Sequence, residues 1–529
     1  MLDLLIAGGQ VLDGTGAPAA RADVGVRGDA IVGVGDLARE PAGRIIDARG
    51  RVVTPGFIDM HSHSDWRLWA NRRAESKIRQ GVTTEVVGNC GFSPAPISEE
   101  FAAEMPGFAL FSGPEMDFRW RSFGEYLARY RDGGTAVNVV HLVGHGAIRL
   151  AAMGFARRAP TAREQAAMER LMDDAMAQGA WGLSTGLIYA PGSYAETEEI
   201  VGIARCAARA GGLYASHIRG EAGTLLDATR EAIRIGREAK IPVQISHVKA
   251  AGRPNWGKVR ESLELVDAAR AEGLDVQGDV YPYTASSTTA RTLLPDWVLE
   301  SGIDAMVERL GQRDVRVRIR AELTGGGRDL LRGLSWSDIL IAFAPGRPIV
   351  AGRRLSDVAA ADGRDGLDAL IELVASERGR ASVILFQIDE ADLRRALVHP
   401  HVMVGSDGSA LAATGPLSQG SPHPRSYGTF PRVLGRYARD EAVLSLPAAV
   451  HKMTGLPARR LGLRARGVLR AGARADLVVL DAAQVGDRAT YESPHQYPEG
   501  IDAVVVNGQV VVQSGEHTGA LPGRVLTRT

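Results

Sequence analysis

Short hydrophobic runs at both ends of the chain predict β-structure there. The runs are LLIAGGQVLD and ADVGVRGDAIVGVG near the start, and ADLVVLD and IDAVVVNGQVVVQSG near the end. Such Val-, Ile- and Leu-rich runs, interrupted by glycine and aspartate, are typical of antiparallel strands joined by tight turns. In the last run, Asn507 and Gly508 separate two valine-rich stretches, and this dipeptide favours a type I′ hairpin. We therefore predict a hairpin at this position.

Between these ends, short apolar runs alternate with helical patterns, as they do in βα units with a parallel sheet. One helix has clear boundaries, because Thr161 and Glu164 form a capping-box pattern and Gly179 follows the last turn. Its apolar face holds Met168, Leu171, Met172, Ala175 and Met176. At this spacing the methionines are predicted to be core residues and not metal ligands.

Nine apolar runs are candidates for parallel strands. They lie at residues 52–60, 83–89, 136–144, 179–185, 212–217, 243–247, 274–280, 381–389 and 401–407. Eight parallel strands with helices between them indicate a (β/α)₈ barrel, so the fold class is α/β with a TIM-like barrel. The run at 381–389 either displaces one of the others or belongs to an insertion. The charged segment at about 292–380 predicts such an insertion, a lid over the barrel mouth.

Composition and charge exclude several classes of protein. The 529 residues include 62 Lys+Arg and 62 Asp+Glu, so no net positive charge favours nucleic acid as a partner. No stretch approaches the ~18 apolar residues of a membrane span, and the N-terminus does not have the layout of a signal peptide. We therefore expect a cytoplasmic protein with no membrane or nucleic-acid partner, while the sequence does not indicate an oligomeric state. Two cysteines exclude a disulfide framework.

Residues of the kinds that bind metals follow several of the predicted strands. Because the chemistry of a (β/α)₈ barrel sits at the carboxyl ends of its strands, we expect these side chains to converge. Any one of them alone could be a capped core residue or part of a turn, but coincidence is improbable for the whole set. His145 follows the third strand in the same way. The predicted metal ligands are His61, His63, Cys90, His217, His247 and Asp407.

The local setting supports two of these positions in particular. In His61-Ser62-His63, the pleat of a strand turns both imidazoles to the same side, where they can share a cation. Cys90 lies in VVGNCGFSPAP, an irregular loop after a strand, and a thiolate is a good zinc ligand that can bridge two metals. Cys206, by contrast, lies on an alanine-rich helix face, where we expect it to be packing.

Together, GFIDMHSHSD, VGNCGFSPAP, the isolated His217 and His247, and VGSDG resemble the amidohydrolase superfamily over essentially the whole chain. Within it they resemble the D-aminoacylase (N-acyl-D-amino-acid deacylase) branch. That branch uses a cysteine where most members have a carbamylated lysine, and Cys90 stands at this position. The resemblance implies that Cys90, His217 and His247 hold one tight zinc ion. His61, His63 and Asp407 would line a second position, which is often weaker or vacant.

The resemblance also implies a domain division and an activity. The barrel would span residues 55–465, and residues 1–54 and 466–529 would form a small β-sandwich. The reaction would be zinc-dependent hydrolysis of N-acyl-D-amino acids to a carboxylic acid and a free D-amino acid. Zinc lowers the pKa of a bound water towards ~7. Asp407 would take the water's proton and pass it to the leaving nitrogen.

Further residues match the substrate contacts of the branch. Arginine can bind an α-carboxylate through two hydrogen bonds, while Tyr281 suits either that carboxylate or the oxyanion of the intermediate. Arg291 could meet an acidic substrate side chain, but we expect it to face solvent, which leaves a hydrophobic D-residue with a short acyl group as the expected substrate. The matching substrate contacts are Lys249, Tyr281, Ser287 and Arg425.

Two alternatives remain open from the sequence. A cyclic-amide hydrolase, similar to a hydantoinase or dihydroorotase, would use the same metal chemistry but normally needs the lysine carbamate. A non-catalytic relative acting as an assembly protein is the second alternative, and the presence of all six candidate ligands argues against it.

Overall fold

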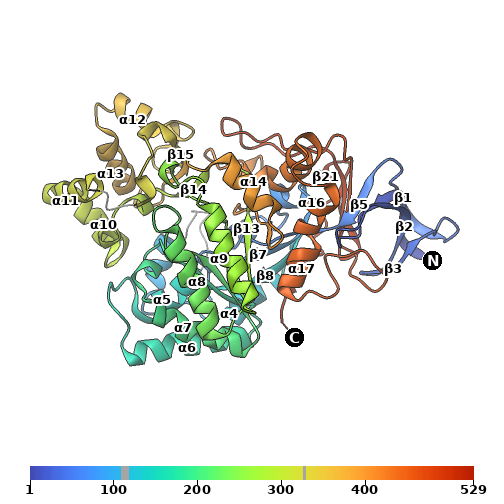
Figure 1. Cartoon of the computed structure of the whole chain (residues 1–529), viewed down its shortest axis with the longest axis horizontal. Helices are drawn as coiled ribbons and strands as arrows, with labels where there is room; N and C mark the ends of the chain where they lie inside the picture. The colour runs from blue at the N-terminus through green and yellow to red at the C-terminus, as the bar shows by residue number, and fades with distance from the viewer. Residues whose placement is uncertain (109–117, 326–328, 529) are drawn as a thin grey trace.

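The structure is a computed structural model that describes residues 1–108, 118–325 and 329–528. Along its longest axis the molecule has a β-sheet domain at one end, a barrel in the middle and a group of helices at the other end (Figure 1). The N-terminus lies at the β-sheet end, whereas the C-terminus lies near the middle of the long axis, as Figure 1 shows. Within the described residues, no helix combines the length and apolar character needed to cross a bilayer.

Eight parallel strands form the barrel, which confirms the predicted fold class. Two backbone hydrogen bonds close the ring between its first and last strands: Asp407 N donates to His61 O at 2.8 Å and His63 N donates to Gly408 O at 2.9 Å. The closure therefore lies beside three of the predicted metal ligands. The strands are β6 (Phe57–Asp59), β7 (Val82–Val87), β8 (Asn138–His141) with β9 (Val143–Gly144), β10 (Gly182–Gly186), β11 (Leu213–His217), β12 (Val243–Ile245), β13 (Val276–Val280) and β17 (Val402–Val404).

Amphipathic helices cover the outside of the barrel. In α8 (Leu225–Ala239), the buried residues Ala228, Ala232, Ile235 and Ala239 recur at the spacing of one helix face. The predicted capping box is confirmed in α6 (Ala162–Ala177), where the Thr161 side chain accepts from Glu164 N. The other helices of this layer are α4 (Phe123–Arg131), α5 (His145–Met153), α7 (Thr197–Arg209), α9 (Val259–Ala271), α14 (Glu390–Val398), α15 (Arg425–Arg432), α16 (Leu446–Met453) and α17 (Gly455–Leu461), with short turns at α1 (Arg67–Ala70), α2 (Glu75–Ile78) and α3 (Met105–Phe108).

Both ends of the chain build one nine-stranded mixed sheet, as their hydrophobic runs predict. The hairpin between β19 and β20 turns at Asn507 and Gly508, whose φ angles of 47° and 80° are both positive, as a type I′ turn requires. The domain boundaries at 54/55 and 465/466 stay a prediction. The strands are β1 (Leu2–Val11), β2 (Ala20–Arg27), β3 (Ala30–Gly35), β4 (Ala42–Asp47), β5 (Val52–Pro55), β18 (Leu477–Leu480), β19 (Ile501–Val506), β20 (Gln509–Gln513) and β21 (Glu516–His517), and the short β22 (Val525–Leu526) instead pairs with β8 of the barrel.

The ninth candidate strand belongs to an insertion between β13 and β17. It becomes β16, the central strand of an antiparallel sheet with β14 and β15. This sheet reaches beyond the predicted range of about 292–380 at both ends, and residues 326–328 lie outside the described residues. Its elements are β14 (Ser286–Thr289), α10 (Gly302–Gly311), α11 (Arg313–Thr324), β15 (Ile339–Phe343), α12 (Leu355–Ala361), α13 (Gly366–Ser376) and β16 (Ser382–Leu385).

Candidate metal centre

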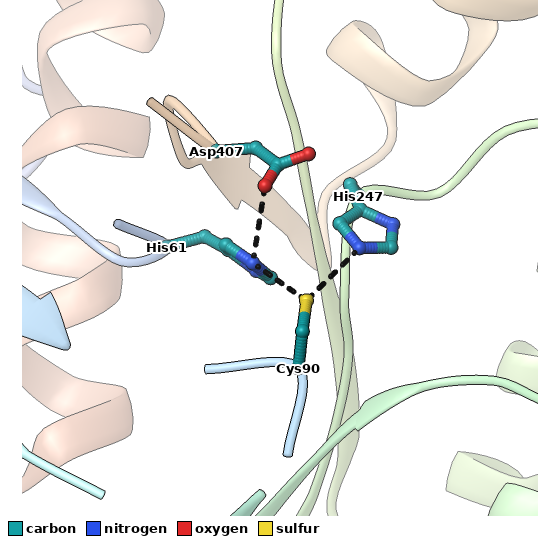
Figure 2. A group of neighbouring side chains, drawn as sticks. All are labelled: His61, Cys90, His247 and Asp407. Carbon is teal, nitrogen blue, oxygen red and sulfur yellow. Dashed lines mark hydrogen bonds and ion pairs between the residues drawn. The ribbon is translucent and has the colours of Figure 1, made fainter. Parts of the chain in front are cut away.

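Four buried side chains from four strand ends point toward one centre (Figure 2). Cys90 Sγ lies 3.3 Å from His61 Nε2 and 3.5 Å from His247 Nε2. On the other side, Asp407 Oδ1 lies 3.5 Å from His61 Nε2. These residues follow β6, β7, β12 and β17, so the closure of the barrel brings together segments that are far apart in the chain. The four ligand atoms lie within 4.8 Å of one another, close enough to share a metal ion.

Three of these residues have an unusual backbone conformation. Cys90, His247 and Asp407 have φ angles of 54°, 36° and 50°, in the left-handed region that residues with a side chain seldom adopt. Such a conformation costs on the order of 1–3 kcal/mol per residue and persists only where the surroundings impose it. Here the backbone N–H of His247 donates to Asp279 Oδ1 at 2.8 Å, which is one such restraint. Backbone strain at three residues whose side chains converge is typical of a functional site.

A second group shares His247 with the first. It consists of His217, Glu221 and His247, whose ligand atoms also lie within 4.8 Å of one another. The rings of His217 and His247 are 4.5 Å apart between centroids. Both ring nitrogens of His217 are buried without a hydrogen-bond partner among the described residues. Because an unpaired buried nitrogen is costly, this imidazole is well suited to bind a metal ion.

Two carboxylates on the outer side of the imidazoles orient them. Asp279 Oδ1 lies 3.3 Å from His61 Nδ1, and Glu221 Oε1 lies 2.9 Å from His247 Nδ1. At His61, a proton on Nδ1 directed at Asp279 leaves Nε2, the nitrogen facing Cys90, free to bind a metal. At His247, both Glu221 Oε1 and Lys249 Nζ, at 2.7 Å, lie against Nδ1, and Nε2 again faces Cys90. Burial alone would lower the pKa of His61, but Asp279 raises it above its ordinary value. Burial outweighs Glu221 at His247, so the pKa of His247 is lowered.

Asp407 is held between a histidine and an arginine. Its Oδ1 lies 3.0 Å from His63 Nε2, and its Oδ2 lies 2.8 Å from Arg425 Nη1. Burial alone would raise the pKa of Asp407, but Arg425 and the neighbouring histidines hold it well below its usual value. This carboxylate is therefore ionised at neutral pH and able to accept a proton.

A buried lysine under the centre ties the first and last barrel strands together. Lys77 Nζ donates to Asp59 Oδ2 at 2.7 Å and to Ser406 Oγ at 2.5 Å, and none of the three side chains reaches solvent. Asp59 Oδ1 in turn accepts from Ser406 N at 2.8 Å and from His61 N at 3.3 Å. Ser406 immediately precedes Asp407, and Asp59 also binds the backbone of His61. The network therefore fixes the backbone at His61 relative to the backbone at Asp407.

Four of the five predicted substrate residues lie beside the centre. Lys249 Nζ donates to Glu221 and to the carbonyl of His247. The guanidinium of Arg425 lies 4.7 Å from the ring centroid of Tyr281, and its Nη2 donates to Ser287 O at 3.4 Å. The Tyr281 hydroxyl is buried without a hydrogen-bond partner among the described residues. A hydroxyl in this state is free to donate to a bound substrate.

Arg291 does not join this group, and it does not face solvent freely as the sequence suggested. Its Nη1 donates to Gly107 O at 2.6 Å, and its Nη2 donates to Phe108 O at 3.4 Å. Burial lowers its pKa to about 10. The helical turn that ends at Phe108 accepts this arginine, a long-range contact that the local sequence does not reveal. His145 is also elsewhere, paired with Glu199 at 2.9 Å.

Two cavities meet at Asp407 and Ser287, which line both of them. The smaller one, of about 20 Å³, lies over the imidazoles, and we call it the inner cavity. The larger one, of about 170 Å³, lies beside Arg425, and we call it the outer cavity. The inner cavity is lined by His217, His247, Lys249 and Tyr281, among others. The outer cavity is lined by Arg67, Phe343, Arg380, His423 and Arg425, among others.

Sequence reasoning missed two carboxylates of this site. Asp279 lies in β13, two residues before Tyr281, so the strand-end pattern that identified the ligands could have found it. Glu221 lies four residues after His217 in an irregular loop, where one charged residue among others gives no distinctive signal. Both act on histidines through Nδ1, a role that depends on the three-dimensional arrangement.

Comparison with known proteins identifies the family. The amidohydrolase family model matches residues 44–512, which is most of the chain. The chain belongs to the amidohydrolase family. Within this family it is similar to D-aminoacylase from Alcaligenes xylosoxydans xylosoxydans, with 42% identity over 527 residues that cover 100% of this chain and 98% of the relative. It is 41% identical over 529 residues to the N-acyl-D-glutamate deacylase of the same organism, covering 100% and 97%.

Solved structures of amidohydrolases agree with this assignment and confirm the resemblance to D-aminoacylase. One D-aminoacylase structure, described as having a binuclear metal centre, superimposes with a TM-score of 0.85 at 41% identity and full coverage of both chains. The N-acyl-D-glutamate deacylase of Bordetella bronchiseptica, complexed with zinc and a phosphonate inhibitor, gives 0.84 at 38% identity, again with full coverage of both chains. The L-hydantoinase of Arthrobacter aurescens gives 0.57 at 18% identity with full coverage, which shows the fold alone.

The donor atoms of this centre fit zinc. A thiol, imidazoles and carboxylates are the ligands that zinc takes in proteins. Burial raises the pKa of Cys90 well above its usual value, with Asp407 and Glu221 adding to the effect. A nearby cation favours the thiolate. A bound zinc ion would give a partner to one ring nitrogen of His217 or to the sulfur of Cys90, which belong to two ligand groups that share His247.

Proposed function

We propose that this chain hydrolyses the amide bond of N-acyl-D-amino acids, giving a carboxylic acid and a free D-amino acid, with zinc as its metal. One observation carries the proposal: Cys90, two histidines and Asp407 converge at the closure of an amidohydrolase barrel. The full-length similarity to deacylases of N-acyl-D-amino acids supports the substrate class. The preference for the D enantiomer rests on these relatives, because the geometry alone does not indicate chirality.

In the proposed centre, Cys90, His217 and His247 would hold the tight zinc ion. His61, His63 and Asp407 would hold a second ion. The position of Cys90 Sγ between His61 and His247 suits a sulfur shared by two metal sites. The two groups of ligand atoms divide the residues differently, with Glu221 beside His217, so this division between metals stays a prediction. Zinc supplies a lowered pKa for a bound water and a positive charge for the amide oxygen.

Asp407 would move the proton in both halves of the reaction. Arg425 keeps its carboxylate ionised, so that it accepts a proton from the attacking water. After the tetrahedral intermediate forms, the same carboxyl group would donate that proton to the leaving nitrogen. Asp407 lines both cavities, so it would lie beside a substrate that occupied both.

The residues around Arg425 would hold the substrate's α-carboxylate. Arg425 keeps donors beyond the one directed at Asp407, since a guanidinium carries five N–H groups. The unpaired hydroxyl of Tyr281 would donate either to this carboxylate or to the oxyanion. Lys249 and Ser287 line the inner cavity and are the remaining proposed substrate contacts. The inner cavity is the smaller of the two, which favours a short acyl group on that side.

No specific observation favours the alternatives. The likeness to hydantoinases is at the level of the fold. A cysteine, Cys90, follows the second barrel strand and joins the cluster of ligand atoms, while the nearby Lys249 is engaged by Glu221. A non-catalytic role does not account for the buried unpaired nitrogens of His217. We also propose that the protein is cytoplasmic, as expected from the sequence.

Matched enantiomers test the proposal. The zinc-loaded protein is expected to hydrolyse N-acetyl-D-leucine and N-acetyl-D-glutamate, with the L enantiomers at least about 100-fold slower in kcat/KM, as expected from the relatives that deacylate N-acyl-D-amino acids. Release of free amino acid is the measurement, and a 5-substituted hydantoin serves as the control substrate. Opening of the hydantoin without hydrolysis of either N-acetyl-D-amino acid would show that the cyclic-amide alternative is correct.

A further inference from the structure

The outer cavity contains an arginine without a partner. Arg67 begins α1, four residues after His63, and its side chain is half-buried in the cavity wall. Its Nε is buried without a hydrogen-bond acceptor, and no ion pair to its guanidinium exists among the described residues. Burial lowers the pKa of Arg67 to about 10, so the group remains charged at neutral pH. An unpaired, partly desolvated cation is unfavourable unless an anion binds to it.

The charges that line the outer cavity are mostly positive. Arg67 comes from the barrel, Arg380 from the insertion and Arg425 from α15. Asp407 is the one acidic residue among the described residues that line this cavity, and it is already paired with Arg425 at 2.8 Å. Arg380 is exposed at the rim, where its Nε donates to a backbone carbonyl. Two positive charges therefore remain without a carboxylate partner in the wall.

We propose that the outer cavity is a subsite for an anionic side chain of the D-amino acid, with Arg67 as its main cation and Arg380 at its rim. The preferred substrates are then N-acyl derivatives of acidic D-amino acids. This inference rests on the proposed function and adds the side chain that the enzyme selects. It replaces the hydrophobic side chain expected from the sequence, and it assigns to Arg67 the contact that the sequence suggested for Arg291.

The position of Arg425 indicates which part of the substrate reaches Arg67. If Arg425 binds the α-carboxylate, the amino-acid half of the substrate lies in the outer cavity, on the same side of Asp407. The acyl half then lies in the inner cavity, which is the smaller of the two cavities and favours a short group. The side chain of the amino acid is thus the group that extends toward Arg67. Phe343 and other apolar residues of the outer cavity would contact its methylene groups.

Overall sequence similarity does not by itself show whether the preferred D-amino acid has an acidic side chain. Relatives that match this chain at 41–42% identity carry the names of three activities: D-aminoacylase, N-acyl-D-glutamate deacylase and N-acyl-D-aspartate deacylase. The unpaired Arg67 is the feature of this chain that favours an acidic side chain.

The test compares N-acetyl-D-glutamate with N-acetyl-D-glutamine, which has nearly the same shape and no side-chain charge. The wild-type enzyme is expected to prefer the glutamate in kcat/KM, and Arg67→Gln is expected to reduce this preference by about 10- to 100-fold, the strength of a hydrogen bond between charged groups. Arg21→Gln, which removes an exposed arginine of β2 in the terminal sheet, is the matched control and should keep the preference. Zinc content and melting temperature are measured for each variant to confirm folding.

Each other outcome has a distinct meaning. A wild-type enzyme that hydrolyses N-acetyl-D-glutamine or N-acetyl-D-leucine as well as N-acetyl-D-glutamate, or a preference that survives Arg67→Gln, overturns the subsite but leaves the deacylase intact. If Arg67→Gln instead slows N-succinyl-D-leucine and not N-acetyl-D-glutamate, the arginine serves the acyl group and the side-chain assignment is wrong. Absence of hydrolysis of every N-acyl-D-amino acid overturns the proposed function itself.

Discussion

Asp407→Asn is expected to keep its tight zinc ion and to lose about 10²- to 10⁴-fold in kcat, the range of general acid–base catalysis. Asparagine has nearly the same size as aspartate and can still accept a hydrogen bond from Arg425. It cannot accept the proton of the attacking water or donate that proton to the leaving nitrogen. The measurement combines kcat on N-acetyl-D-glutamate and N-acetyl-D-leucine with the zinc content found by elemental analysis.

Asp481→Asn is the matched control for this variant. Asp481 also forms an ion pair with an arginine, at 3.1 Å to Arg51, but it lies beside the terminal sheet and away from the centre. Its replacement is expected to leave kcat unchanged, because Asp481 lines neither cavity. Near-normal hydrolysis by the Asp407 variant would show that another group moves the proton.

Cys90→Ala is expected to remove the tight metal and, with it, the activity. The thiolate would be the only sulfur ligand at the centre, and alanine offers no donor atom in its place. Loss of a residue that merely supports a metal ligand already costs about 10- to 100-fold in affinity, so loss of the ligand itself should cost more. Zinc per chain, measured after dialysis, should fall far below that of the wild-type protein.

Cys206→Ala provides a control with the same chemical change. Cys206 is buried in α7, where its sulfur contacts Arg209 and not the metal ligands. This variant should retain zinc and turnover. Unchanged zinc content in Cys90→Ala would mean that the sulfur is not a ligand, and the assignment of the tight site would then be wrong.

Local patterns in the sequence were enough to predict the elements that local chemistry determines. Asn507 and Gly508 both need positive φ angles, and these two residue types tolerate them, so the hairpin could be located from the dipeptide. Thr161 and Glu164 satisfy the first backbone N–H groups of α6 within one turn. The barrel followed from repeated strand and helix patterns, which do not depend on distant contacts.

Elements that depend on distant partners could not be placed as well. The apolar run that became β16 looks like a barrel strand, and only its pairing with β14 and β15 shows that it belongs to the insertion. β14 itself has the sequence SSTT, without an apolar face, so no hydrophobic pattern predicts a strand there. The insertion therefore proved longer than the charged segment suggested.

The metal ligands were predictable for a physical reason that does not extend to their partners. His61, Cys90 and Asp407 each follow a strand, and the barrel brings strand ends together. Glu221 acts through the Nδ1 atom of His247, and Arg67 matters because it has no partner. Neither property can be read from neighbouring residues, since both depend on which side chains the fold brings close.

The zinc dependence of N-acyl-D-amino-acid hydrolysis tests the central claim most directly. The protein is stripped with a chelator, its metal content is checked by elemental analysis, and release of D-glutamate and D-leucine from their N-acetyl derivatives is followed as zinc is added back. We predict that the stripped protein is at least about 100-fold less active and that about one zinc ion per chain restores turnover. Full activity in protein shown to be free of metal would contradict the account.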